Sequence, residues 1–265
     1  MRRWLAAAVL GGGVAATAYW RRSLTLDGAL AAAVVGCIVF ARGGRAPAGA
    51  LLTFFISSSL LSRVGRRRKS GELLAQAKGA RRDAIQVLAN GGFATLSSML
   101  GPRHGGGGFV GALSAAAADT WATELGMLAR QKPRMITTLR PVAPGTSGGV
   151  TLEGLAASLG GALGVGLAWS GLSGSWQAVP LAGVAGVCGS LLDSVLGATI
   201  QALYRCATCD AFSEEPRHRL CGQAAELVRG QAWVTNDMVN ALATLAGAAI
   251  GAACWRGDWA SGRQR

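Results

Sequence analysis

The chain alternates along its whole length between apolar segments and shorter polar or basic segments. The apolar segments are continuous blocks, and most lack the polar face that a soluble helix would present. They cover residues 4–20, 24–41, 47–62, 84–100, 109–129, 152–170, 180–204 and 238–255. Each approaches the ~20 residues that a helix needs to cross a bilayer, although several are short. The pattern therefore predicts an all-α, polytopic transmembrane helical bundle of about eight spans, in one integral membrane domain over residues 1–265.

The composition agrees with a membrane location. Hydrophobic residues make up 51% of the chain, which also contains 40 glycines. Small residues let helices approach closely in lipid, where packing holds them together. The alternative, a very apolar soluble helical protein, would require polar helix faces that these segments lack. We therefore expect a multi-pass membrane protein that is embedded in the lipid bilayer.

The first apolar segment also has one feature of a signal peptide, because Arg2 and Arg3 precede it. It continues into Tyr19-Trp20-Arg21-Arg22 without a small-residue cleavage site, and a second apolar segment follows directly. We expect this first segment to be retained as a membrane anchor.

The net charge of +13 lies largely in the connections between apolar segments. In a soluble protein such an excess would favour nucleic-acid binding, but connections rich in Lys and Arg mark the cytoplasmic side of a membrane protein. We expect 63–82, 130–151 and 205–237 on that side, and no nucleic-acid partner. The connections 101–108 and 171–179 hold one Arg between them and should lie opposite.

Polar side chains interrupt the apolar segment 109–129. They are Asp119, Thr120, Thr123 and Glu124, which occupy one arc of about 140° on a helical wheel. Asp119 lies roughly 15 Å from the predicted cytoplasmic end of its span, at 1.5 Å per residue. Carboxylates at this depth are costly and are normally retained for function, although a single one could simply bond to a neighbouring serine or to the backbone.

Other polar residues lie on spans that open to the same side. Asp193 is near the middle of 180–204, Asn90 is just inside 84–100, and Asn236 and Asn240 are at the start of the last span. We expect these groups to meet in one pocket that faces the cytoplasm. Asn240 could instead serve as a hydrogen-bonding contact between helices.

The connection after Glu124 contains residue types that bind phosphate. Arginines can clamp phosphates bidentately, hydroxyls can donate to them, and glycines allow close approach of backbone N–H groups. The candidates are Arg134, Thr137, Thr138, Gly145, Thr146, Ser147, Gly148 and Gly149. Two or three carboxylates nearby could hold Mg²⁺, which bridges phosphate oxygens. The spacing is not that of a P-loop, and a plain glycine turn is the alternative.

Three of the six cysteines fall in the connection 205–237. Cys206, Cys209, His218 and Cys221 form a C-x₂-C-x₈-H-x₂-C pattern that offers four zinc-type ligands. A cytoplasmic loop is reducing, which disfavours a disulfide. We expect a structural zinc that holds this loop together; unmetallated thiols and a redox pair are the alternatives.

Several separated motifs resemble those of one family. The run Ala118-Asp119-Thr120-Trp121-Ala122-Thr123-Glu124-Leu125-Gly126 resembles the A-D-T-W-[AS]-[ST]-E-[IL]-G signature of the transmembrane protein 19 family, also called domain of unknown function 92. Similar stretches, in the expected order, are Arg82–Gly92, Pro133–Thr138, Pro144–Val150, Gly189–Thr199 and Asn236–Asn240. The resemblance covers about residues 5–255, and the Cys/His loop is similar to that of prokaryotic members.

The family is similar to the phytyl-phosphate kinase of plants, which converts phytyl phosphate to the diphosphate. The resemblance therefore implies a kinase that transfers a phosphoryl group from a nucleoside triphosphate to a polyprenyl or phytyl monophosphate. On this interpretation Asp119, Glu124 and Asp193 hold Mg²⁺ and orient the acceptor. Arg134, Thr137, Thr138 and the segment 145–149 bind phosphates, and Asn90, Asn236 and Asn240 complete the pocket.

Two alternatives from other classes remain at this point. The intramembrane carboxylates could form the ion or proton path of a transporter, although transporters often contain internal repeats that are not evident here. The chain could also be a membrane protein without catalytic activity.

Overall fold

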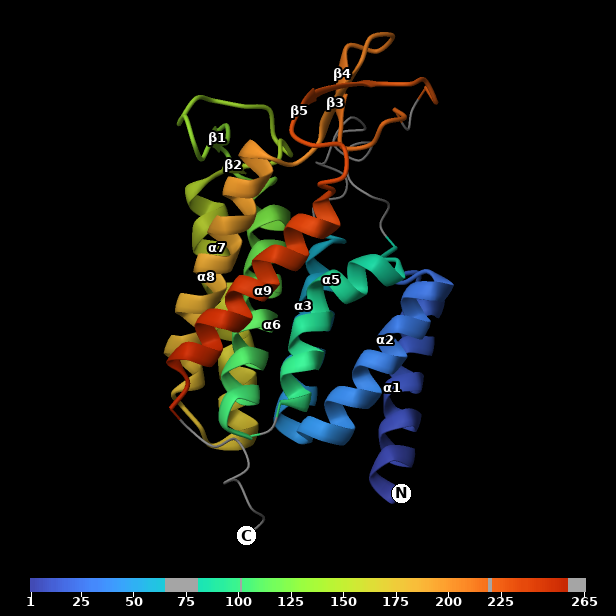
Figure 1. Ribbon diagram of the computed structural model, residues 1–265, viewed down its shortest axis with the longest axis vertical. Coiled ribbons are helices and arrows are strands. Elements are labelled where there is room, and N and C mark those ends of the chain that lie inside the picture. The colour runs from blue at the N-terminus through green and yellow to red at the C-terminus, as the bar shows by residue number, and fades with distance from the viewer. Residues whose placement is uncertain (65–80, 101, 219–220, 257–265) are drawn as a thin grey trace.

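The computed structural model describes residues 1–64, 81–100, 102–218 and 221–256, and it places a helix in each predicted apolar segment. The elements run from α1 to α9 in a bundle (Figure 1). The helices are α1 (Arg2–Trp20), α2 (Leu26–Ile38), α3 (Arg45–Leu61), α5 (Ala84–Met99), α6 (Pro102–Gly126), α7 (Leu152–Ser173), α8 (Ala178–Thr199) and α9 (Asn236–Cys254), with a short π-helix, η1 (Val39–Gly43), between α2 and α3.

Two small antiparallel sheets make the fold not purely helical, which corrects the all-α prediction. The first sheet pairs β1 (Arg134–Met135) with β2 (Gly149–Val150). The second has the order β4-β3-β5, from β3 (Leu203–Cys206), β4 (Ala211–Ser213) and β5 (Glu226–Arg229). Both lie in the two long connections, where backbone groups beyond the helix ends need hydrogen-bond partners.

The second sheet also shortens a predicted span. The apolar pattern predicted 180–204, but α8 ends at Thr199. Beyond that point the backbone pairs with the segment after β5: the N–H of Gln231 donates to the carbonyl of Ile200 (3.0 Å), and that of Ala202 to the carbonyl of Val234 (3.0 Å). The apolar residues Leu203 and Tyr204 therefore belong to a strand rather than to the membrane helix.

Four helical segments are long and apolar enough to cross a membrane, so the predicted count of eight spans is not confirmed. They are Leu26–Gly43, Leu152–Ser173, Ala178–Thr199 and Asn236–Cys254, while Arg45–Leu61 is apolar but shorter. The central helix α6 does not need an apolar, lipid-facing surface to stay in the bundle. Every residue from 105 to 118 is buried by protein, so neighbouring helices rather than lipid surround it.

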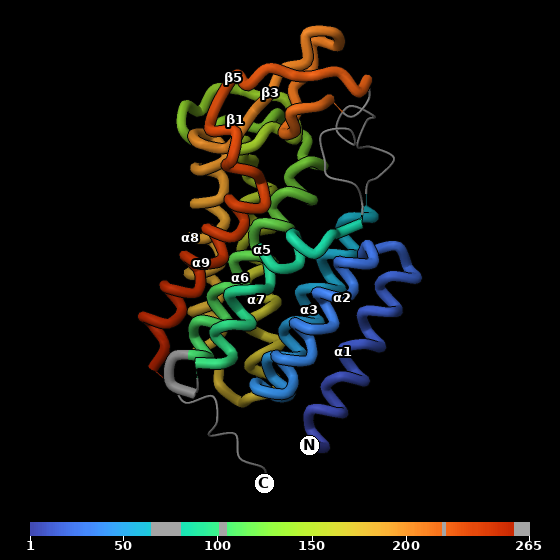
Figure 2. The backbone as a smooth tube through the Cα atoms, turned by 45° about the vertical axis from the view of Figure 1, so that its right-hand side comes forward, coloured from blue at the N-terminus to red at the C-terminus, as the bar shows by residue number. Residues whose placement is uncertain are grey.

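Glycines allow the close packing of α6 against α9. A Cβ atom at Gly107 would lie 2.2 Å from the carbonyl oxygen of Gly251, and one at Gly111 would lie 2.0 Å from that of Gly247. Any side chain there would push the two backbones apart. Figure 2 shows α6 among α5, α7 and α9, with α1 at the edge of the bundle beside α2.

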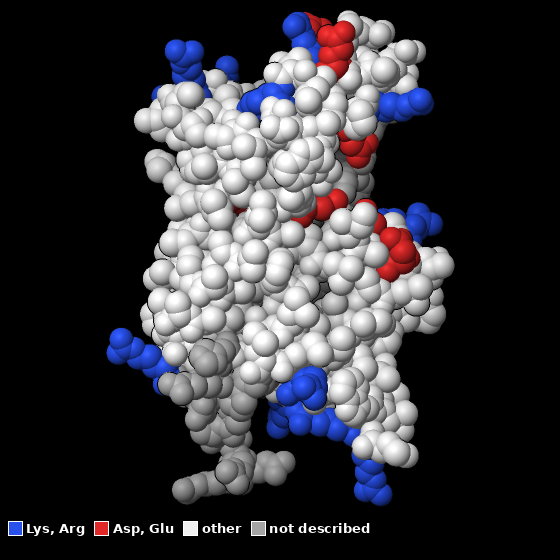
Figure 3. Space-filling view, in the orientation of Figure 1, with Lys and Arg blue, Asp and Glu red and all other residues white. Residues whose placement is uncertain are grey.

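The two sheets lie at the same end of the bundle, and the connection between α7 and α8 lies at the other end (Figure 1). On the face drawn in Figure 3, a broad, mostly uncharged belt separates the Lys and Arg side chains of the two ends. This arrangement places the connections 130–151 and 205–237 on one side, as the charge pattern predicted. Much of the basic segment 63–82 lies outside the described residues, since these stop at Val64 and resume at Arg81.

Candidate active site and metal-binding cluster

A cavity of about 380 Å³ opens at the end of the bundle that carries the sheets. Its walls come from α5, α6, α7, α8, α9, the end of α3, the connection between α6 and α7, and the loop after α8. Most of the predicted site residues line it together: Asn90, Asp119, Glu124, Gly145, Thr146, Ser147, Gly148, Gly149, Asp193, Asn236 and Asn240. The cavity also explains their spacing in the sequence, because each wall contributes the end of one helix or one loop.

Two of the carboxylates that line this cavity form a pair. The side chains of Asp119 on α6 and Asp193 on α8 interact directly. The helices come this close because a Cβ atom at Gly189 on α8 would lie only 2.5 Å from that of Ala115 on α6. The Oδ2 atom of Asp193 is buried without a hydrogen-bond partner among the described residues. Two adjacent buried carboxylates require a proton or a cation between them.

The third predicted carboxylate, Glu124, has different partners. Its Oε1 atom accepts a hydrogen bond of 2.6 Å from the hydroxyl of Ser62, at the end of α3. Its charge also faces Arg82. Glu124 therefore lies in the same cavity as Asp119, but the contacts that orient it differ from those of the aspartate pair.

Arg82 is a cavity residue that the sequence reasoning did not select. Among the described residues that line the cavity, Arg82 is the one basic side chain. Burial lowers the pKa of its guanidinium, and the nearby Glu124 raises it; an arginine in such a setting keeps its charge. Its place in the motif that begins at Arg82 was the available sequence signal.

The turn between α1 and α2 fixes the backbone of Arg82. The N–H of Arg82 donates to the carbonyl of Ser23 (3.0 Å), and its carbonyl accepts from the N–H of Thr25 (3.1 Å). Thr25 also caps α2. A Cβ atom at Gly28 would lie 2.2 Å from the carbonyl oxygen of Arg82, so glycine is required for this approach. These backbone contacts hold Arg82 in place whatever its side chain does.

The segment Gly145–Gly149, called the glycine turn below, forms part of the cavity wall. Gly148 has a positive φ of 83°, and its carbonyl accepts from the N–H of Ile136 (2.9 Å). A Cβ atom at Gly148 would lie 2.5 Å from that of Ala198 on α8. Within the turn, the N–H of Gly149 donates to the carbonyl of Thr146 (2.9 Å). The glycine turn thus packs tightly on the end of α8 and lines the same cavity as the aspartate pair.

Arg134, Thr137 and Thr138 do not line the cavity. All three are exposed, and Arg134 and Thr138 make hydrogen bonds within the β1–β2 connection instead. The Arg134 guanidinium donates to the carbonyl of Leu139 (2.9 Å), and the Thr138 hydroxyl accepts from the N–H of Arg140 (3.4 Å). Their role in phosphate binding stays a prediction, and Arg82 occupies the place in the cavity that had been expected for Arg134.

Other polar residues line the cavity without having been predicted. They are Ser62, Gln86, Thr151, Ser190, Ser194, Gln201 and Glu214. Gln86 lies one helical turn before Asn90, and its side-chain oxygen accepts from the N–H of Asp83 (3.2 Å) in the capping box at the start of α5. Glu214 comes from the Cys/His loop, and the sequence around it gave no indication that this loop reaches the cavity.

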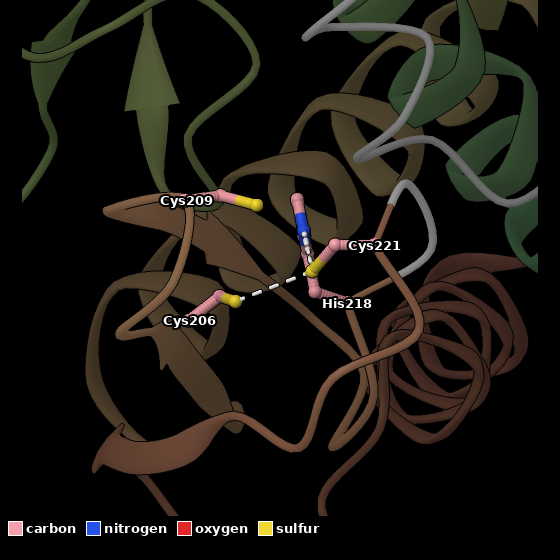
Figure 4. Close-up of side chains that lie close together, drawn as sticks. All are labelled: Cys206, Cys209, His218 and Cys221. Carbon is pink, nitrogen blue, oxygen red and sulfur yellow. Dashed lines mark hydrogen bonds between the residues drawn. The ribbon is translucent and has the colours of Figure 1, made fainter.

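The Cys/His loop brings its four predicted ligands together (Figure 4). The ligand atoms of Cys206, Cys209, His218 and Cys221 all lie within 4.8 Å of one another. The Sγ atoms of Cys206 and Cys221 are 3.6 Å apart, and the Nδ1 atom of His218 is 3.2 Å from the Sγ of Cys221. This Cys₃His cluster could hold a metal ion.

The thiols of the cluster compete for protons. The backbone N–H of Cys209 lowers the pKa of Cys206, whereas the neighbouring Cys221 thiol raises the pKa of Cys209 to about 11. A metal ion bound by these sulfurs would supply the positive charge that stabilises thiolates.

Comparisons with known proteins agree with the fold. The chain is 33% identical to Protein PGR of Arabidopsis thaliana, over 92% of this chain and 93% of that protein. It is 34% identical to an uncharacterized membrane protein of Methanocaldococcus jannaschii, over 68% of this chain and 76% of the relative. An uncharacterized membrane protein of Synechocystis is 28% identical, over 93% and 89%. No solved structure matches the chain.

Residues 9–248 match the family described as "Integral membrane protein DUF92". The resemblance found in the motifs is therefore confirmed, and the multi-pass membrane location with it. The chain belongs to the DUF92 family of integral membrane proteins.

Proposed function

We propose that the chain is a membrane phosphotransferase, which transfers a phosphoryl group from a nucleoside triphosphate to a polyprenyl or phytyl monophosphate. The observation that carries this proposal is one cavity that combines an interacting aspartate pair, an arginine and a glycine turn. It lies at the end of a bundle whose helices are apolar enough to contact lipid. A prenyl tail could thus remain in the bilayer while its phosphate enters the cavity.

Arg82 is the residue best placed to bind phosphate oxygens. Its backbone is held by the α1–α2 turn, and Glu124, anchored by Ser62, orients its guanidinium by charge. The glycine turn, which belongs to the connection between α6 and α7, lines the same cavity and adds the Thr146 and Ser147 hydroxyls. Positioning and charge neutralisation are sufficient for in-line phosphoryl transfer, without a covalent intermediate.

Asp119 and Asp193 fit the requirements of a Mg²⁺ site. They offer oxygen ligands, which this cation prefers, and the buried Oδ2 of Asp193 has no hydrogen-bond partner among the described residues. When bound, Mg²⁺ would neutralise charge on the phosphate oxygens. Without it, the two carboxylates would repel an anionic substrate. We assign Glu124 to Arg82 rather than to the cation, because its contacts are with Ser62 and Arg82.

We further propose that the Cys₃His cluster binds zinc. Three sulfurs and one imidazole nitrogen form a donor set typical of structural zinc. Four protein ligands leave no open position for chemistry, so this metal would stabilise the loop.

The test of the enzyme proposal is a kinase assay on purified protein with phytyl, geranylgeranyl and farnesyl phosphates, Mg²⁺ and each common nucleoside triphosphate. We expect formation of a prenyl diphosphate and a higher melting temperature with Mg²⁺–nucleotide. If no combination of prenyl phosphate and nucleoside triphosphate gives product, and Mg²⁺–nucleotide does not raise the melting temperature, the proposal is contradicted. Uptake of an anionic solute into proteoliposomes would then favour a transporter.

A further inference from the structure

The Cys/His loop contributes directly to the cavity through Glu214. This residue follows β4 and lines the cavity, with its charge near Asp193 and Arg229. Its Oε1 atom accepts a hydrogen bond from the hydroxyl of Ser147 in the glycine turn. The Gln201 amide donates to the same Oε1 atom (2.9 Å) and to the Ser147 hydroxyl (3.2 Å). Three separate chain segments thus meet in one closed hydrogen-bond network.

The register of the β3–β4 hairpin explains how Glu214 reaches this position. Tyr204 pairs with Ser213, and Cys206 pairs with Ala211. The hairpin therefore leaves α8 near Gln201, turns beyond Cys206, and returns so that Glu214 lies beside its own starting point. Cys206 and Cys209 are at the tip of the hairpin, and Glu214 is at its base.

The chain after Glu214 is fastened at a second place. His218 and Cys221 meet Cys206 and Cys209 in the Cys₃His cluster, and His218 is buried. The cluster thus ties the segment that follows Glu214 to the tip of the hairpin that precedes it. Glu214 lies between these two fixed points and has little freedom to leave the cavity.

A further contact joins the same loop to the end of α8. The guanidinium of Arg229 on β5 donates to the carbonyl of Gly197 (2.9 Å). Burial lowers the pKa of Arg229, and the charge of Glu214 raises it. A Cβ atom at Gly197 would lie 3.1 Å from the N–H nitrogen of Gly148. The loop is therefore bonded both to the glycine turn, through Glu214, and to the end of α8 on which the turn packs, through Arg229.

We propose that Glu214 is a positioning residue that holds the glycine turn in place as the cavity wall, and that the Cys₃His cluster fixes Glu214 for this task. Glu214 holds the turn through Ser147, and the Gln201 amide bonds to both Glu214 and Ser147. Binding of phosphate by the turn rests on the proposed function, whereas the position of the turn can be measured without any substrate.

The test is hydrogen exchange, followed by mass spectrometry, over residues 133–151 of the full-length protein in detergent. The N–H groups of Ile136 and Gly149 are hydrogen-bonded to Gly148 and Thr146 in this segment and report on its opening. We expect Glu214→Ala to accelerate exchange there by about tenfold or more, since a hydrogen bond to a charged group contributes at least that factor to a local equilibrium. Glu226→Ala is the matched control, because Glu226 is an exposed carboxylate on β5 of the same loop.

Ser147→Ala tests the same contact from the opposite side and serves if Glu214→Ala fails to fold. The double variant should exchange no faster than the faster single variant, because both changes break one network. Removal of metal with a chelator, or Cys209→Ser, should accelerate exchange in the wild type and add nothing in Glu214→Ala. If the protein is an active kinase, Glu214→Ala should raise the KM for the prenyl phosphate more than it lowers kcat.

Two results would overturn the proposal. One is unchanged exchange over 133–151 in both Glu214→Ala and Ser147→Ala. The other is acceleration in those variants without any effect of metal removal or Cys209→Ser. Because exchange needs no substrate, either result is distinct from a failure of the kinase assay.

Discussion

At the scale of single residues, the proposed function requires the aspartate pair to hold a cation, since two uncompensated carboxylates would repel a phosphate. Asp119→Asn keeps the shape and most hydrogen bonding but removes one charge of the pair. We expect turnover to fall roughly 10²-fold or more, since one electrostatic contact at the transition state typically contributes ~2.7–4 kcal/mol. The protein should still fold, because replacing a buried charge with an amide relieves its desolvation cost.

The measurement is prenyl-phosphate kinase activity of wild type, Asp119→Asn and Asp193→Asn in proteoliposomes. Asp210→Asn is a suitable control, because Asp210 forms an exposed ion pair with Arg205 outside the cavity. An active wild type with near-full turnover in both cavity variants would exclude the cation role of the pair.

Arg82 offers a second test at this scale. Arg82→Gln removes the guanidinium, but the contacts of the residue with the α1–α2 turn are made by its backbone, so the fold should persist. We expect the KM for the prenyl phosphate to rise about tenfold or more, with a smaller rise in Arg82→Lys, because lysine keeps the charge but loses bidentate binding. The neighbouring Arg81→Gln should leave KM unchanged, since Arg81 contacts Tyr19 outside the cavity. Equal KM values for Arg82→Gln and Arg81→Gln would refute this assignment.

At the scale of elements, the Cys/His loop is too small to form a hydrophobic core of its own. Its strands have three or four residues each, so the cluster must supply much of its stability. We expect about one zinc per chain, as for other Cys₃His structural sites. Cys209→Ser should lose the metal and lower yield or melting temperature, whereas Cys188→Ser, an exposed position on α8, should keep it. Elemental analysis of protein purified without chelator, if it finds no stoichiometric metal, contradicts this prediction.

The elements also differ in how far the sequence could predict them. The apolar blocks located each α-helix in the described residues, because helices that contact lipid or lie inside the bundle are rich in apolar residues. The start of α6 was missed: it begins at Pro102, within the stretch 101–108 that was expected to be a connection. The strands β1 to β5 were missed, since each has only two to four residues and its pairing partner lies elsewhere in the connection. The end of α8 at Thr199 was missed for the same reason: Leu203 and Tyr204 are apolar, and only their strand partners distinguish them from a helix.

The same distinction applies to the site. Asp119, Asp193 and the Cys/His ligands stood out, because charges in apolar segments and regular cysteine spacing are local signals. Arg82 and Glu214 did not, because an arginine or glutamate in a polar connection is ordinary until the fold directs it into a cavity. Arg134 was selected for its sequence neighbourhood, but the β1–β2 pairing turns it outward.

At the scale of the whole molecule, the cavity and both sheets share one end of the bundle, so their side of the membrane determines which substrates can reach them. The connection 130–151 carries Arg130, Lys132, Arg134 and Arg140, whereas 171–179 has no Lys or Arg. Positive connections remain in the cytoplasm, which predicts a cavity open to cytoplasmic nucleotides.

A cysteine at the exposed Ala143 should therefore resist a membrane-impermeant maleimide in intact cells, and one at the exposed Gln177 should react. Both should react after permeabilisation, relative to the parent chain. Labelling at position 143 but not 177 in intact cells would place the cavity outside, where nucleoside triphosphates are scarce, and the kinase proposal would lose its phosphoryl donor.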